Sequence, residues 1–277
     1  MLRDGFSPLT PRMIEWLRIA VLGVVEGITE FLPVSSTGHL LLTEALFRHK
    51  QSDLFNTVIQ TGAVLAVIAV FGARIKKLTL GWKEPANQIY LAKLAAAFLI
   101  TAAGGLLLKS GNWKLPHSAI PVAWATLDGG ILFIVVEKWL RGKKVAAEIT
   151  WTVAVAVGVG QLIAAVFPGA SRSGTTILMA LLLGVARPHA AEFSFLLGIP
   201  TLIAAGGHEI LDALRHQTPH EPWPQLVFAA TLAGVTASFV VRWLLQYIQT
   251  HDFSRFGWYR IALGGVMLLL AAQGAIH

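Results

Sequence analysis

The sequence contains no cysteine and few charged residues. Across 277 residues there is no Cys, and the charged types make up 13% of the chain, against about 25% in a typical soluble domain. The absence of cysteine excludes disulfides, thiolate catalysis and cysteine-ligated metals, although it does not fix a cellular compartment. With 55% hydrophobic residues and a mean hydropathy of +0.64, the composition predicts a polytopic membrane protein.

Lys and Arg occur mainly in clusters between the apolar runs. The formal net charge is +7, but no basic patch is interleaved with aromatic residues as nucleic-acid binding requires, so no nucleic-acid partner is expected. With the N-terminus outside, the basic clusters would all lie inside and the acid-containing segment 208–222 outside, in agreement with the positive-inside rule. Arg48 and Lys50 are one mild exception. The clusters are 74–83, 138–144 and 242–260.

The apolar runs predict an all-α fold with two similar series of helices. Pro33 and Pro168 each end a run and precede a short helix, so each break predicts a re-entrant hairpin whose backbone is satisfied by protein or a cavity. Pro200 predicts a kink, and a loop is expected beyond residue 207. The expected helices are 13–32, 37–47, 54–72, 90–108, 120–136, 149–167, 173–185, 193–207, 226–247 and 261–275.

The two halves align under a constant shift, which places Glu26 on Gln161, Pro33 on Pro168 and Ser36 on Ser171. We therefore expect residues 1–277 to form a single integral membrane domain with an inverted-topology repeat. Each half would be a re-entrant helical hairpin plus three transmembrane helices. An odd number of crossings inserts the second copy upside down, as in inverted-repeat transporters. The repeats are expected at about 13–140 and 148–277.

The first break carries the motif EGITEFLPVSSTGH at residues 26–39. Glu26 and Glu30 are four residues apart, so on a helix they share a face and could hold a divalent cation or place one acid as a base. The alternative is a pair of acids that face a wet cavity. Because charge inside a membrane is costly, we favour a functional role.

Hydroxyl groups occupy the position where the next helix begins. At least one of Ser35, Ser36 and Thr37 is expected to cap that helix, and the same N-terminus is suited to binding phosphate, with Gly38 permitting close approach. His39 lies three residues beyond Ser36, near enough on a helical turn to exchange its proton. The simpler alternative is a histidine satisfied by a neighbouring helix.

The second break carries PGASRSGTT at residues 168–176 and adds a cation. The planar guanidinium of Arg172 suits two phosphate oxygens and does not deprotonate. An ion pair with Glu26 or Glu30 is the structural alternative, and the two roles are compatible. The other histidines are expected in loops or at the terminus and solvated; they are His49, His117, His189, His208, His216, His220, His251 and His277.

These two motifs, together with EFSFLLGIP at 192–200, closely resemble the bacterial undecaprenyl-diphosphatase family, integral membrane phosphatases linked to bacitracin resistance. The resemblance covers essentially the whole chain. It implies hydrolysis of undecaprenyl diphosphate to the monophosphate and inorganic phosphate, which recycles the lipid carrier for peptidoglycan. It also implies a site open to the outer face of the cytoplasmic membrane, a divalent cation (Mg²⁺ or Ca²⁺), membrane lipid as surroundings and a homodimer.

The resemblance also implies roles for individual residues. Ser36 would attack the terminal phosphorus and form a phosphoserine, and His39 would manage its proton. Glu26 and Glu30 would bind the metal or orient water, and a water nucleophile activated by that metal remains open. The phosphate would be held by Arg172, Ser171, Ser173, Thr176, Gly38 and Gly174.

Three other interpretations are weaker. A transporter or lipid flippase would also use an inverted repeat with broken helices, but the cluster of Ser, His, Arg and Glu is richer than ion binding needs. The broader lipid phosphatase class has Lys, Arg-Pro, Ser-Gly-His and Ser-Arg motifs, which residues 36–39 only approximate. A membrane scaffold would not require buried acids and arginine.

Overall fold

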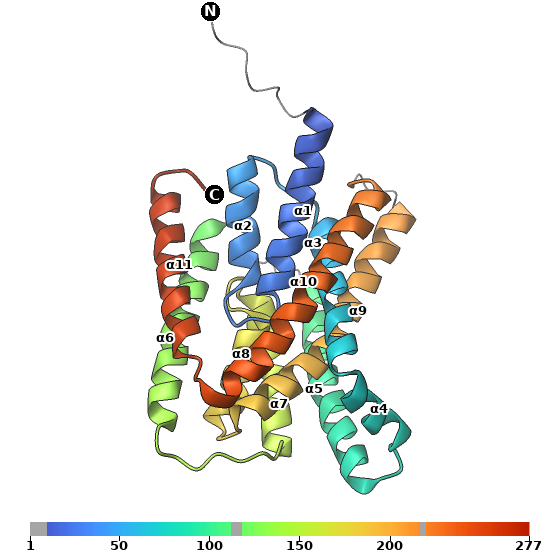
Figure 1. Cartoon of the computed structure of the whole chain (residues 1–277), viewed down its shortest axis with the longest axis vertical. Helices are drawn as coiled ribbons and strands as arrows, with labels where there is room; N and C mark the ends of the chain where they lie inside the picture. Colours follow the sequence, from blue (N-terminus) through green and yellow to red (C-terminus); the bar gives the residue numbers. More distant parts are fainter. Residues whose placement is uncertain (1–9, 112–117, 217–219, 277) are drawn as a thin grey trace, which may run out of the picture.

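The described part of the chain is entirely helical in its regular structure. A computed structural model describes residues 10–111, 118–216 and 220–276, and these ranges contain eleven α-helices and no strand (Figure 1). The expectation of an all-α fold is confirmed. The helices are α1 (Pro11–Thr29), α2 (Ser36–Phe47), α3 (Asp53–Val70), α4 (Gly72–Leu80), α5 (Pro85–Ser110), α6 (Ala119–Leu140), α7 (Trp151–Val166), α8 (Arg172–Leu182), α9 (Arg187–His216), α10 (Trp223–Thr250) and α11 (Ser254–Ala272).

Six of the described helices are long and apolar enough to cross a membrane: α3, α5, α6, α9, α10 and α11. The protein is therefore a multi-pass membrane protein, as the composition predicts. The helices that flank the two proline breaks, α1, α2, α7 and α8, are not among these six. The second helix of each hairpin, α2 or α8, has 12 or 11 residues, which is well short of the roughly 20 residues that span a bilayer.

The helix bounds differ from the sequence prediction in several places, and two differences are the largest. Residues 72–80 form the basic helix α4, although the expected span ended at residue 72. Helix α9 passes through Pro200 and ends only at His216, so 208–216 is helical and not a loop. Within it, Gly206 allows close packing against Thr61, because a Cβ there would lie 2.1 Å from the Thr61 hydroxyl oxygen.

Because α9 is longer than expected, three histidines that were expected in loops lie on a helix. His189, His208 and His216 lie on this helix and not in loops. His49, His220 and His251 lie outside the described helices, as expected. The expectations for two others, His117 and His277, fall outside the described residues.

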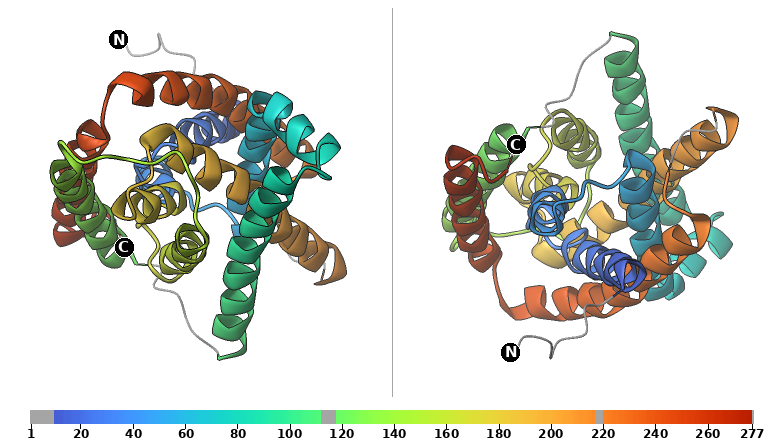
Figure 2. Two further views of the ribbon diagram at one scale, coloured as in Figure 1. Left: turned by 90° about the horizontal axis from the view of Figure 1, so that it is seen from below. Right: turned by 90° about the horizontal axis from the view of Figure 1, so that it is seen from above.

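Several contacts of the described helices in one half of the chain have a counterpart in the other half, although the contact of α2 with α6 does not. Helix α1 packs against α10, and its counterpart α7 packs against α5. Helix α3 packs against α10 and α9 against α5, while α2 contacts α11 and α8 contacts α6. The pairs α3 with α9 and α6 with α11 join the two halves. In end-on view, the short helices α2 and α8 lie near the centre with longer helices around them (Figure 2).

Candidate active site

The first hairpin turn ends in a serine cap. Helix α1 stops at Thr29, and the chain turns through Pro33 before α2 starts at Ser36. Ser35 is the N-cap residue, with φ at 74°, and its hydroxyl oxygen accepts a hydrogen bond of 3.2 Å from the Gly38 amide. The expectation that one of these hydroxyls caps the helix is confirmed, and Ser35 is that residue.

The second turn ends in the same way but has one more residue between its proline, Pro168, and its cap. Ser171 has φ at 68° and accepts a 3.1 Å hydrogen bond from the Gly174 amide. The structural counterpart of Ser171 is therefore Ser35, not Ser36, and the sequence alignment is wrong by one residue beyond the prolines. The additional residue lies between Pro168 and the cap, where Gly169 adopts φ at 98°. In consequence, Ser36 and Arg172 occupy equivalent positions as the first residues of α2 and α8.

Ser36 and Arg172 both donate hydrogen bonds to the carboxylate of Glu30. The Ser36 hydroxyl donates to Glu30 Oε2 at 2.9 Å, and Arg172 Nη2 donates to Glu30 Oε1 at 2.8 Å. Both members of the ion pair are largely buried, with side-chain exposures of 14% for Arg172 and 6% for Glu30. The ion pair between the hairpins that the sequence suggested is present, and it brings a hydroxyl and a guanidinium to the same acid.

Glu26 lies one helical turn before Glu30 and is completely buried. Neither of its carboxylate oxygens has a hydrogen-bond partner within the described ranges. Its polar neighbours are the Glu30 carboxyl group and the Arg172 guanidinium. Burial of an acid is costly unless such groups compensate it. Glu26 therefore has free oxygen ligands beside a carboxylate that is already shared.

Glu26 and Glu30 can contribute two ligands to a divalent-cation site, but they cannot complete one alone. The described residues contain no group of three or more His, Cys, Asp or Glu side chains arranged to hold a metal. Mg²⁺ commonly uses one or two carboxylates and takes its other ligands from water and substrate phosphates. The free oxygens of Glu26 fit that pattern, with Glu30 as the second carboxylate.

His39 makes the contacts of the simpler alternative, because a neighbouring helix satisfies its ring and Ser36 does not. Its Nδ1 lies 2.7 Å from the Ser35 carbonyl oxygen and its Nε2 lies 2.7 Å from the Tyr259 hydroxyl, with the two rings stacked. Because a carbonyl only accepts, Nδ1 donates, and Nε2 of the neutral ring accepts from Tyr259. Within the described chain, no hydrogen bond joins His39 to Ser36; the Ser36 hydroxyl hydrogen goes to Glu30.

The other predicted phosphate-binding hydroxyls engage protein groups. Ser173 Oγ lies 3.1 Å from the carbonyl oxygens of both Glu30 and Leu32, so it ties α8 to the first turn. Thr176 Oγ1 lies 2.6 Å from Ser194 Oγ on α9. Both residues are fully buried. Gly38 and Gly174 direct their amides to the cap serines. That these hydroxyls and glycines also contact phosphate stays a prediction.

Four residues near the turns were not identified as site residues from the sequence: Thr126, Ser194, Tyr259 and Arg260. Arg260 was assigned to the basic cluster at 242–260, but it lies on α11 with an exposure of 0%. That assignment is wrong, because the arginine is inside the protein and bonds backbone carbonyls of both turns. An arginine followed by an apolar run was the available signal.

Two cavities adjoin the hairpins. One, of about 470 Å³, is lined by Thr37 and by polar and charged residues near the end of α2 and the start of α3, including Glu44, Arg48 and Lys50. The other, of about 540 Å³, is lined mainly by apolar and aromatic residues and reaches His39. Its aromatic walls come from α10 and α11: Trp243, Tyr247, Phe256 and Tyr259.

The fold and the site define a class: a multi-pass membrane protein with a serine, a carboxylate and an arginine joined at buried helix N-termini, an arrangement suited to phosphoryl transfer. The chain belongs to the bacitracin resistance protein BacA family, whose model matches residues 19–266. It is 48% identical over 266 residues to the undecaprenyl-diphosphatase of Rhizobium etli (strain CIAT 652), covering 95% of this chain and 100% of that protein. The undecaprenyl-diphosphatase of Xylella fastidiosa (strain 9a5c) is 47% identical, covering 92% of this chain and 98% of the relative.

Proposed function

We propose that this protein is a membrane phosphatase that hydrolyses undecaprenyl diphosphate to undecaprenyl phosphate and inorganic phosphate, and so recycles the lipid carrier for peptidoglycan synthesis. The names of its near-full-length relatives support the substrate and reaction, and they do not favour a transporter or flippase. The observation that carries the proposal is the Glu30 carboxylate shared by the Ser36 hydroxyl and the Arg172 guanidinium.

In the first step, Ser36 Oγ attacks the terminal phosphorus. A bond forms between Oγ and phosphorus, the anhydride bond to the bridging oxygen breaks, and undecaprenyl phosphate leaves. The 2.9 Å hydrogen bond favours Glu30 as the group that takes the hydroxyl proton. Water then hydrolyses the phosphoserine, which restores Ser36 and releases inorganic phosphate.

Arg172 would stabilise the charge of the transferring phosphoryl group. Its guanidinium has donors beyond the one bonded to Glu30, and Nε has no partner within the described residues although it is buried. Free donors of this kind suit phosphate oxygens. The first amides of α2 and α8 would add positive dipole ends at the same place. His39, held by Ser35 and Tyr259, would transfer protons at Nε2 after rotating away from Tyr259 or through that hydroxyl.

A divalent cation would be held by Glu26 and Glu30, with phosphate oxygens and water as its other ligands. When bound, Mg²⁺ or Ca²⁺ would neutralise charge on the diphosphate. The partnerless oxygens of Glu26 support this assignment. Attack by water in place of Ser36 is the alternative route.

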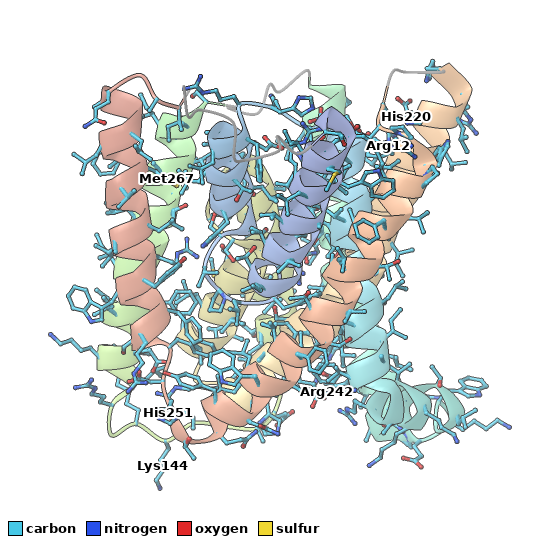
Figure 3. All side chains as sticks on the ribbon, turned by 45° about the horizontal axis from the view of Figure 1, so that its top comes forward. Arg12, Lys144, His220, Arg242, His251 and Met267 are labelled. Carbon is cyan, nitrogen blue, oxygen red and sulfur yellow. The ribbon has the colours of Figure 1, made fainter. Side chains whose placement is uncertain are left out.

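We place the protein in the bacterial cytoplasmic membrane as an inverted repeat, with each half a re-entrant hairpin plus three crossings, and as a homodimer. The charge distribution supports the orientation: Lys144 and Arg242 lie toward one end of the bundle, with Arg12 and His220 toward the other (Figure 3). The basic end would face the cytoplasm. The polar cavity near α2 would then open to the periplasmic side and admit water, while the apolar cavity would take the prenyl chain.

Phosphate release from undecaprenyl diphosphate by detergent-purified protein tests the function. Wild type should release phosphate, and Ser36→Ala, Glu30→Gln, His39→Ala and Arg172→Ala should each release less. Ser238→Ala is a suitable control, because this hydroxyl bonds only its own helix among the described contacts. A folded wild-type protein that releases no phosphate would refute the proposal.

A further inference from the structure

Arg260 is a buried cation that the proposed mechanism does not use. It is the largest of the fully buried side chains on the described chain, with an exposure of 0%. No described carboxylate forms an ion pair with it, and all its hydrogen bonds go to backbone carbonyls. An arginine inside a membrane helix costs at least about 2.5 kcal/mol. Such a residue needs a specific reason to be present.

The guanidinium connects three segments that are distant in the sequence. It reaches the first hairpin turn, the second hairpin turn and helix α6 at the same time. The bonds run from Nη1 to Pro33 O at 3.3 Å, from Nη2 to Gly169 O at 3.1 Å, Ala170 O at 3.0 Å and Ala125 O at 3.1 Å, and from Nε to Thr126 O at 3.0 Å. One side chain therefore fixes the backbones of both turns against α6.

The surrounding glycines show how closely the guanidinium fits. A Cβ added at Gly129 on α6 would lie 2.1 Å from Arg260 Nη2. A Cβ added at Gly174, in the first turn of α8, would lie 2.9 Å from Nη1. The cation thus fills the space between α6 and the start of α8, two residues from Arg172.

Thr126 forms a second connection at the same place. It is completely buried on α6. Its hydroxyl donates to the Val122 carbonyl of its own helix at 2.7 Å, and the same oxygen lies 3.3 Å from Ser35 Oγ and 3.2 Å from the Gly169 carbonyl oxygen. The first contact reaches the cap of α2 and the second reaches the other turn. Arg260 and Thr126 therefore contact both turns from the α6–α11 pair, which also joins the two halves of the fold.

The turns carry the reacting groups. Pro33 lies between Glu30 and Ser36, and Ala170 is two residues before Arg172. We propose that Arg260 is a positioning residue for the phosphatase site: it holds the two turns at the spacing at which Ser36 and Arg172 meet on Glu30. This inference rests on the proposed function. Lysine could not replace it, because one ammonium group lacks the planar set of five donors that spans three segments.

The test compares kcat and KM of the variants. The concentration of folded protein, measured by size-exclusion chromatography, is used to calculate kcat. Two variants disturb the contact: Arg260→Lys changes the side chain, and Gly129→Ala displaces it without changing its charge. Two controls are matched. Arg242→Lys changes an exposed arginine on α10, and Gly265→Ala adds a methyl group to α11 where no atom lies within 4 Å.

We expect kcat to fall about 100-fold in both variants while KM stays within about threefold, because small misplacements of reacting groups lower turnover more than binding. Both controls should match wild type. A purely structural role would reduce the yield of folded protein and leave its kcat unchanged. Arg260→Lys that is folded and has wild-type kcat would overturn the proposal.

If Arg260→Lys yields no folded protein, Gly129→Ala decides the question, because its methyl group displaces the guanidinium. Folded Gly129→Ala with wild-type kcat would overturn the proposal. Thr126→Val removes the second connection and keeps the shape of the side chain, so kcat should fall about tenfold. A folded wild-type protein without phosphatase activity would instead refute the proposed function, and the role of Arg260 with it.

Discussion

The two hairpin turns share a framework and differ in the residues placed on it. Each turn contains a proline and ends at a serine with positive φ. The serine hydroxyl caps the next helix by accepting from the amide three residues on. The first residue of the helix is then Ser36 in one copy and Arg172 in the other. Equivalent backbone positions therefore carry a candidate nucleophile and a permanent cation, and both are directed to Glu30.

The difference extends into the helix before each turn. Glu26 lies on α1, while Gln161 occupies the aligned position on α7, and both are buried. Gln161 donates to Thr101 at 3.0 Å and carries no charge. Gln161 Oε1 also has no hydrogen-bond partner in the described chain, but the amide has no charge to compensate. The comparison shows that the two turns share their serine caps and differ in charge. In the proposed function, the first turn supplies the acids and the nucleophile, and the second supplies one arginine.

The largest expected effect is that of Ser36→Ala. Loss of a covalent nucleophile should lower kcat by at least about 10⁴-fold. Acid-quenched wild type should contain phosphoserine at this position by mass spectrometry, and the variant should not. Substantial turnover by Ser36→Ala would favour attack by water. Ser36 would then bind the phosphate, as is proposed for Arg172, and would not be the nucleophile.

Arg172→Ala tests the second copy. We expect kcat to fall about 10³-fold, as for other arginines that stabilise a transferring phosphoryl group. Removal of one partner of a buried ion pair also destabilises a fold by about 3–5 kcal/mol. The double variant Arg172→Ala with Glu30→Gln should regain part of that stability in thermal unfolding, but no activity. Independent effects of the two changes on stability would contradict the shared contact.

Glu26→Gln replaces the acid on α1 by the residue type found at the aligned position on α7, Gln161. We expect kcat to fall about 100-fold and stimulation by added Mg²⁺ or Ca²⁺ to disappear, with folding retained. The reciprocal change Gln161→Glu should cost at least about 2.5 kcal/mol of stability, because it buries a new charge, and should leave the cation response of the folded protein unchanged. An undiminished cation response in Glu26→Gln would exclude Glu26 as a ligand.

The smallest effects concern the shared caps. Ser35→Ala and Ser171→Ala should each destabilise the protein by about 1 kcal/mol through loss of the cap. Glycine at either position should be tolerated better than alanine, because it adopts positive φ without strain. Thermal unfolding of the four variants measures this order. A large difference between the two sites would show that the turns are not equivalent in energy.

The sequence predicted much of the helix pattern, since long apolar runs and prolines determine where helices can form and end. It also suggested the ion pair of Arg172 with an acid of the first hairpin. The polar residues at 208–216 predict a loop, but α9 continues through them, because polar composition alone does not end a helix. The repeat alignment failed by one residue because identical serines in adjacent positions make the register ambiguous.

The sequence by itself determined the membrane class, the two motifs and their residue types, because hydropathy and local spacing are properties of the chain alone. Only the tertiary structure decided which groups meet. It paired Ser36 with Glu30 and His39 with Tyr259, and it moved Arg260 from a surface cluster to the centre between the turns. These contacts join residues 90 or more positions apart, or depend on the rotation of a helix N-terminus, and local sequence patterns do not encode either.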